Sequence, residues 1–276
     1  MEIRYSADPV RYHKMDSGEL RASYLVEGLF EAGVVALVYS DADRAIIGSA
    51  VPVKAPLQLS TSDELKAEYF TERRELGVLN IGGSGKVQVE GQSYSMGNLD
   101  CLYVGRGNRR VEFASDDPAQ PAQYYLLSYP AHTAYPTAMV RKAEANAVNL
   151  GTEAQCNRRM LYKCIHPDGI RSCQLVMGFT DMQTGSVWNT MPPHTHARRS
   201  EVYLYFNIAA SQRVFHFMGE PRETRHLVVA DKQAVISPSW SIHSGAGTSS
   251  YTFCWGMGGE NQRFDDMDAA PVESLR

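Results

Sequence analysis

The chain has 276 residues with 27 lysines and arginines, 31 aspartates and glutamates, and a formal net charge of −4. This balance gives no reason to expect nucleic acid or an anionic membrane surface as a partner. No apolar run approaches the roughly 20 residues of a membrane span, and the first residues lack the basic and apolar regions of a secretory signal. The five cysteines are odd in number and form no C-x-x-C motif, which is typical of free thiols in a reducing compartment. We therefore expect a soluble, cytoplasmic protein, long enough for one large domain or two of ordinary size.

The first half is expected to begin with a little helix and to continue in short strands. Asp16 and Glu19 form a capping-box pattern for a helix that ends near Glu27. From Val34 onward, strand-like runs alternate with glycine-containing turns, a pattern typical of a β-sandwich or barrel. Strands are expected at residues 34–39, 44–53, 57–59, 76–81, 86–89, 93–96, 101–104, 111–114 and 123–128.

The second half repeats this scheme after a boundary between Pro130 and Pro136, which a helix-like pattern at residues 138–147 follows. Strands are expected at residues 158–165, 173–180, 187–190, 202–208, 213–218, 224–229, 234–236 and 251–257. We expect one domain at residues 1–135 and a second at residues 136–276, with the tail 261–276 wrapping or capping part of the protein.

The two halves share a short internal sequence similarity. Arg73-Arg74-Glu75, followed by Leu-Gly-Val-Leu-Asn, is similar to Arg198-Arg199-Ser200-Glu201, followed by Val-Tyr-Leu-Tyr-Phe-Asn. The first copy has no His-x-His pair, and Asn108 stands where the second copy has His243. This internal similarity favours two barrels. The first of them lacks the residues that could bind a metal in the second, which are described next.

The metal ligands are expected in the second half. His194 and His196 project from the same face of a strand, because side chains alternate with a period of two. Glu201 would fall on the opposite face of a continuous strand, so the chain must turn or bulge between them, as in a hairpin whose second strand starts at Glu201. His243 follows Pro238 in a turn that leads into another strand. An isolated His-x-His pair is often unrelated to metal, but three imidazoles and one carboxylate in a β-rich context indicate a divalent-metal site.

This pattern resembles the two sequence motifs of the cupin superfamily. The first motif is a glycine-led His-x-His followed by Glu, and the second is Pro-x-Gly-x-x-His. Trp188 stands near the start of the first motif in place of its glycine, and Trp240 replaces the glycine of the second. The turn glycines therefore differ from the motifs, whereas the four ligands match them.

Longer segments resemble one cupin family, the 5-keto-4-deoxyuronate isomerases (4-deoxy-L-threo-5-hexosulose-uronate ketol-isomerases) of pectin breakdown. The segments are 70–83 (FTERRELGVLNIGG), 188–196 (WNTMPPHTH), 234–245 (AVISPSWSIHSG) and 258–268 (GGENQRFDDMD). The resemblance spans nearly the whole chain. It implies an all-β bicupin of two jelly-roll β-barrels with a few short helices, and a homo-oligomer, in this family a hexamer. It also favours one Zn²⁺ per chain, although the ligand set suits Fe²⁺, Mn²⁺ or Ni²⁺ as well.

The implied reaction converts 5-dehydro-4-deoxy-D-glucuronate to 3-deoxy-D-glycero-2,5-hexodiulosonate, so the expected partner is a small acidic sugar. Moving the carbonyl from C1 to C2 requires a proton shuttle or a hydride shift, and both build negative charge that a cation stabilises. A cupin dioxygenase and a non-catalytic sugar-acid-binding cupin stay open as alternatives.

Several residues are candidates for substrate binding and catalysis. Arg199 could bind the substrate carboxylate through charge-assisted hydrogen bonds. Adjacent residues cannot both point inward, so at most one of Arg198 and Arg199 can serve. The alternative is that both belong to a solvated turn. Tyr203 shares the inward face with Glu201 and could donate a hydrogen bond, or could simply pack in the barrel.

Two further residues are candidates for proton transfer. Glu260, beside Asn261, follows a glycine-rich run and could act as a base, and His226 could shuttle a proton because imidazole titrates near neutrality. A hydrogen-bonded core position is the alternative for His226.

Overall fold

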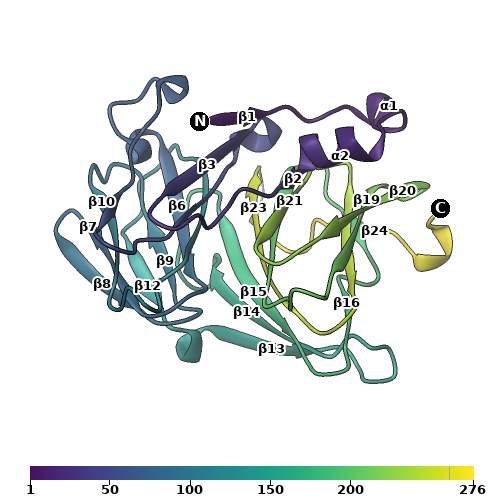
Figure 1. Cartoon of the computed structure of the whole chain (residues 1–276). Helices are drawn as coiled ribbons and strands as arrows, with labels where there is room; N and C mark the ends of the chain where they lie inside the picture. Colours follow the sequence, from purple (N-terminus) through teal and green to yellow (C-terminus); the bar gives the residue numbers. More distant parts are fainter. Residues whose placement is uncertain (261) are drawn as a thin grey trace.

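The computed structural model describes residues 1–260 and 262–276, in which strands are the main regular structure and helices are few (Figure 1). In the first half, a seven-stranded sheet packs on a four-stranded sheet. The larger sheet has the order β1 (Glu2–Arg4), β3 (Val35–Ser40), β4 (Ile46–Ala50), β11 (Tyr124–Pro130), β6 (Arg74–Asn80), β9 (Cys101–Val104) and β12 (Ala138–Val140). The smaller has the order β5 (Leu57–Gln58), β10 (Val111–Ser115), β7 (Gly85–Val89) and β8 (Gln92–Met96).

The second half has the same plan. Its seven-stranded sheet has the order β13 (Asn146–Leu150), β14 (Arg159–Ile165), β15 (Val176–Met182), β23 (Thr252–Gly259), β18 (Arg199–Phe206), β21 (Gln233–Ser237) and β2 (Leu25–Val26). Its four-stranded sheet has the order β16 (Trp188–Asn189), β22 (Ile242–Gly247), β19 (Val214–Glu220) and β20 (Glu223–Val229). A separate pair joins β17 (His194–Thr195) to β24 (Asp268–Ala269).

The helices are short. They are α1 (Pro9–Tyr12), α2 (Ser17–Tyr24) and the 3₁₀ turns η1 (Ala42–Arg44), η2 (Asp63–Leu65), η3 (Phe70–Glu72), η4 (Lys142–Glu144) and η5 (Val272–Ser274). The predicted capping box is confirmed, because Asp16 accepts from the Glu19 N–H and Glu19 accepts from the Asp16 N–H. The helix ends at Tyr24 rather than near Glu27, since Leu25 is already extended and starts β2. No helix in the described ranges is long and apolar enough to cross a membrane.

The matching plans confirm the prediction of two barrels. In each half, one strand that starts with an arginine lies at the same place in the large sheet: β6 lies between β11 and β9, and β18 lies between β23 and β21. A buried apolar cluster fills each barrel, with Leu76 and Val78 of β6 in the first and Tyr203 and Tyr205 of β18 in the second.

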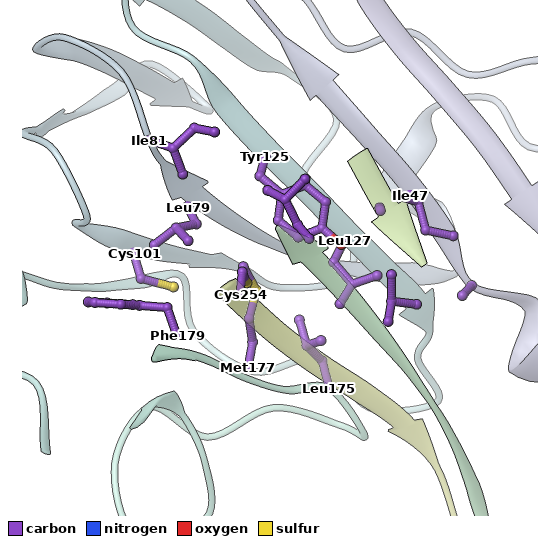
Figure 2. Close-up of a cluster of buried hydrophobic side chains, with 14 of the residues drawn as sticks. Ile47, Leu79, Ile81, Cys101, Tyr125, Leu127, Leu175, Met177, Phe179 and Cys254 are labelled. Carbon is purple, nitrogen blue, oxygen red and sulfur yellow. The ribbon is translucent and has the colours of Figure 1, made fainter. Parts of the chain in front are cut away.

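A third core lies between the two large sheets. Figure 2 shows Leu79, Cys101 and Leu127 of the first half packed with Met177 and Cys254 of the second half. The sheets approach closely enough that a Cβ added at a glycine of β23, Gly256, would overlap Leu127. The two barrels therefore share a buried apolar interface.

Glu75 is part of this interface. It is fully buried and accepts hydrogen bonds from the Tyr103 hydroxyl and from the backbone N–H groups of residues 173–175. Alternation along β6 turns Leu76 into the first barrel and Glu75 toward the second half. Glu75 and Glu201 are therefore similar in sequence context but not in position, because Glu201 faces the inside of its own barrel.

Each half adds an edge strand to the other. β2 pairs with β21, and β12 pairs with β9. The first residues of the chain, including α1 and α2, lie over the second half beside β19 and β20 (Figure 1). The predicted helix at 138–147 is wrong: the segment forms β12, η4 and the start of β13, because β12 pairs with the backbone of β9 and Met139 packs on the first core. The division between residues 135 and 136 stays a prediction.

Candidate metal centre

Four side chains from separate elements converge inside the second barrel. His194 lies on β17, His196 in the turn after it, Glu201 on β18 and His243 on β22. One ligand atom from each lies within 4.8 Å of all the others. The Nε2 atom of His243 is 3.0 Å from both His194 Nε2 and Glu201 Oε2, and His196 Nε2 is 3.0 Å from the same oxygen.

The local backbone explains how Glu201 reaches the histidines. The chain turns between His196 and Arg199, whose N–H donates to the His196 carbonyl at 3.3 Å. β18 begins at Arg199, so alternation places Arg199, Glu201 and Tyr203 on the inward face. The predicted hairpin is wrong in one respect: β17 pairs with β24 near the C-terminus and not with β18.

Burial and mutual contact set the charge states of the cluster. Burial, together with the neighbouring His243, lowers the pKa of His194 to about 3. Burial alone would raise the pKa of Glu201, but His243 and His196 outweigh it and hold that pKa well below its usual range. Burial likewise opposes the charged form of His196, yet the Glu201 carboxylate raises its pKa. An ionised Glu201 and a neutral His194 are the forms that bind a cation.

These residues fit a divalent ion. Zinc binds nitrogen and oxygen ligands at about 2.0–2.2 Å, so the 3.0 Å separations within the cluster are short enough for one ion to contact these atoms together. The Nδ1 of His196 lies 2.8 Å from the Arg199 carbonyl, which orients the ring with Nε2 toward the centre. Histidine nitrogen and carboxylate oxygen suit zinc, iron(II), manganese and nickel alike. The cluster is therefore a metal-binding site.

The site opens on a cavity of about 330 Å³. Its wall is mostly apolar, with two arginines and a few hydroxyl groups. The lining residues are Arg159, Leu161, Thr180, Thr190, Met191, Pro192, His194, Arg199, Glu201, Tyr203, Phe253, Trp255, Met257, Phe264 and Met267.

The structure brings both predicted substrate-binding residues to this cavity. The Tyr203 hydroxyl lies 2.9 Å from Thr190 Oγ1. Arg199 is buried, whereas Arg198 is exposed, as the alternation argument predicts. The Arg199 Nη2 donates to Asp266 Oδ1 at 2.7 Å, while its Nε and Nη1 have no partner within the described residues.

Glu260 and His226, the predicted proton-transfer residues, are not brought to the cavity. Both side chains are exposed. His226 lies on the outer face of β20, because Leu227 and Val229 take the inward positions. Glu260 lies just past the end of β23, where its backbone N–H donates to the Arg198 carbonyl. Asn261 lies outside the described residues.

The sequence analysis missed one buried polar group beside the site. His216 of β19 is fully buried, and its Nδ1 lies 2.8 Å from the Tyr205 hydroxyl. Burial lowers its pKa to about 3, with His243 adding to the effect. Alternation of inward residues along β19, from Val214 through His216 to Met218, is the signal that could have found it.

Comparisons with known proteins show the family of the chain. Residues 25–272 match the KduI/IolB family. The chain belongs to this family. A KduI/IolB relative from Shouchella clausii, named 4-deoxy-L-threo-5-hexosulose-uronate ketol-isomerase, is 54% identical over 276 residues, which cover both chains completely. A protein of the same name from Formosa agariphila is 54% identical over 275 residues, covering 100% of this chain and 98% of its own.

Solved structures support the fold of this KduI/IolB chain. An IolB-like protein from Salmonella typhimurium has a TM-score of 0.69 at 12% identity, covering 90% of this chain and 97% of its own. A mutant of Bacillus subtilis oxalate decarboxylase has a TM-score of 0.60 at 11% identity, covering 86% of this chain and 76% of its own. At such low identity the likeness concerns the two-barrel fold alone.

Proposed function

We propose that the chain is a metal-dependent ketol-isomerase that converts 5-dehydro-4-deoxy-D-glucuronate to 3-deoxy-D-glycero-2,5-hexodiulosonate in pectin and uronate breakdown. The observation that carries this proposal is the 54% identity, over both full chains, to a protein with that activity in its name. The cluster of three histidines and one glutamate supports it, because His194 and Glu201 line a cavity of about 330 Å³, which has the size of a small-molecule site.

The side chains of the site have distinct tasks in this reaction. His194, His196, Glu201 and His243 would hold a divalent ion, which as a Lewis acid stabilises negative charge on the substrate oxygens. Burial raises the pKa of Tyr203 well above its usual value, so its hydroxyl keeps its proton and can donate to a substrate oxygen.

Arg199 contributes the unpartnered donors of its guanidinium to the substrate. Because Asp266 holds one end of the guanidinium, the side chain is oriented before the substrate arrives. The proposal includes neither Glu260 nor His226, since both side chains are exposed and neither lines the cavity within the described part of the chain.

We propose Zn²⁺ as the ion, because three histidines and one carboxylate are common zinc ligands; Fe²⁺, Mn²⁺ and Ni²⁺ suit the same donors. A cytoplasmic homohexamer is proposed from the family resemblance.

A direct assay tests this function. The purified protein is analysed for metals, stripped with a chelator, reloaded with one metal at a time, and given the 4-deoxy-5-keto uronate in buffered D₂O. We expect NMR to show the 2,5-diulosonate product with the reloaded protein and not with the stripped protein. Deuterium at the carbon that receives hydrogen indicates a proton shuttle, and its absence a hydride shift.

Other results would contradict the proposal. Oxygen-dependent turnover with iron and none with zinc would indicate a dioxygenase. Binding of the uronate without conversion would indicate a sugar-acid-binding protein.

A further inference from the structure

The two arginines of the metal cavity differ in how their charge is balanced. Arg199 has an ion pair with Asp266, and both side chains are buried. Arg159 is half-buried, and its Nη1 donates to a neutral acceptor, the Asn157 carbonyl, at 2.8 Å. No carboxylate among the described residues forms an ion pair with Arg159. Since guanidinium groups stay protonated in proteins, Arg159 gives the cavity a cation without a counter-charge.

Arg159 also lies apart from the metal ligands. It is the first residue of β14, two strands beyond β23 in the order β14-β15-β23-β18, whereas Glu201 is on β18. Apolar side chains of the strands between, such as Trp255 and Phe253, line the wall from one to the other. The cavity therefore has a metal site and a free cation joined by an apolar surface.

A uronate has its reacting carbons and its carboxylate at opposite ends, as the cavity has its metal site and its free cation. Its reacting carbons, C1 and C2, lie at one end of a six-carbon chain, and its carboxylate carbon, C6, lies at the other. We propose that Arg159 binds the C6 carboxylate of the substrate and so selects acidic sugars over neutral ones. This inference rests on the proposed function. A guanidinium suits the task because it can bind both carboxylate oxygens at once through charge-assisted hydrogen bonds.

Arg199 is less suited to the same carboxylate. Its Nη2 lies 2.7 Å from Asp266 Oδ1, so a second carboxylate on this guanidinium would lie close to a buried negative charge. Like charges that close repel strongly where water is excluded. The remaining donors of Arg199 are therefore available for the neutral hydroxyl and carbonyl oxygens of the sugar.

The test compares a charged substrate with a neutral one. The variants are Arg159→Met, which keeps the side-chain length, Arg159→Lys, which keeps the charge, and Arg158→Met as the matched control. Arg158 is the preceding residue, is exposed and forms its ion pair with exposed Glu153. Each metal-loaded variant is assayed with the uronate and with its C6 methyl ester, alongside measurement of metal content and circular dichroism.

We expect Arg159→Met to raise the KM for the uronate about 10- to 100-fold, the effect of losing a charge-assisted hydrogen bond. The KM for the ester and both kcat values should change little, Arg159→Lys should recover part of the loss, and Arg158→Met should behave as the unmodified protein. If Arg159→Met does not fold, a uronate-selective rise in KM for Arg159→Lys supports the same assignment.

Equal changes with both substrates would overturn the assignment, as would a uronate-selective KM effect in Arg199→Met but not in Arg159→Met. Failure of the proposed function looks different, because the unmodified protein would then convert neither substrate. In that case, calorimetric binding of D-glucuronate against D-glucose still tests Arg159: equal affinities of the unmodified protein and Arg159→Met for D-glucuronate would overturn it.

Discussion

His243 joins the four-stranded sheet to the rest of the metal cluster. It comes from β22, whereas Glu201 comes from the seven-stranded sheet, and its Nε2 is 3.0 Å from two of the other ligands. The Nδ1 of the same ring is buried without a partner in the described chain, so every printed polar contact of this side chain is with another member of the cluster.

His243→Ala should remove the metal and abolish turnover while the protein stays folded. The fold persists because the cluster around the site, which includes Tyr203, Val214 and Met218, is apolar and buried. Elemental analysis, turnover and circular dichroism check this outcome. His226→Ala is the control, because that exposed side chain lies on the outer face of β20 and should affect neither metal nor activity. Full activity of His243→Ala without bound metal would refute the role of the cluster.

His216 should make the stability of the protein depend on pH. Burial lowers its pKa from 6.5 to about 3, so the unfolded chain binds a proton between these pH values that the folded protein does not bind. Stability contributed by this residue is therefore lost as the pH falls from about 6.5 toward 3, by about 1.4 kcal/mol per pH unit within that window.

Urea unfolding of the metal-loaded protein and of His216→Gln at pH 7, 6 and 5 measures this effect. The free energy of unfolding should fall less steeply with acidification in the variant. Equal slopes would show that His216 is not held neutral in the folded state.

At the residue scale, local spacing indicated that His194, His196 and Glu201 lie together, whereas His243 needed the pattern after Pro238 as well. His194 and His196 are two residues apart, and Arg199, Glu201 and Tyr203 alternate on one strand, so the backbone period decides where each side chain points. The same period, applied to Leu227 and Val229, would have placed His226 outside. Arg159, His216 and Asp266 have no motif, and only the assembled barrel brings them to the site.

At the element scale, the segment 262–270 contributes to the wall of the cavity. Its strand β24 pairs with β17. Phe264 and Met267 line the cavity, and Asp266 forms an ion pair with Arg199. The backbone N–H of Ala270 donates to the Pro193 carbonyl at 3.0 Å, next to the ligand His194. The segment therefore supports both a metal ligand and an arginine of the site.

Asp266→Asn should destabilise the protein by on the order of 3 kcal/mol, because it leaves the buried Arg199 guanidinium without its counter-charge. It should also lower turnover, since Arg199 loses the contact that orients it. Asp265→Asn is the matched control: Asp265 is the neighbouring, exposed carboxylate and should give unchanged stability and activity. Urea unfolding and the uronate assay check both, and equal stability of the two variants would contradict a structural role for the ion pair.

The strands were predictable from alternation and turn residues, but their partners were not. Most expected strands correspond to strands of the barrels, and some, such as β7 and β18, have buried side chains at every second position or throughout. The pairing of β17 with β24 joins segments far apart in the sequence, and no local pattern encodes it. The helix-like stretch at 138–147 forms strands for the same reason, because β9 supplies a partner for β12.

At the scale of the whole molecule, the two barrels depend on each other. They share the core of Figure 2, in which Leu79 and Leu127 pack with Met177 and Cys254, and they exchange β2 and β12. The buried Glu75 carboxylate of the first half accepts three backbone hydrogen bonds from the second. Neither half can bury the apolar side chains of this shared core, or satisfy the Glu75 carboxylate, without the other.

The fragment 136–276, although it contains all four metal ligands, should therefore neither fold cooperatively nor retain metal. The full chain should unfold in one calorimetric transition, with the ratio of van't Hoff to calorimetric enthalpy near unity. Two separate transitions, or a fragment that gives sharp NMR signals and binds zinc, would show that the halves are independent.

The position of β24 also has a consequence for a shortened chain. Residues 262–270 follow His194, His196, Glu201 and His243 in the sequence, so a chain cut before residue 262 keeps all four ligands. It loses Asp266, which holds Arg199, and the β24 partner of β17, which carries His194.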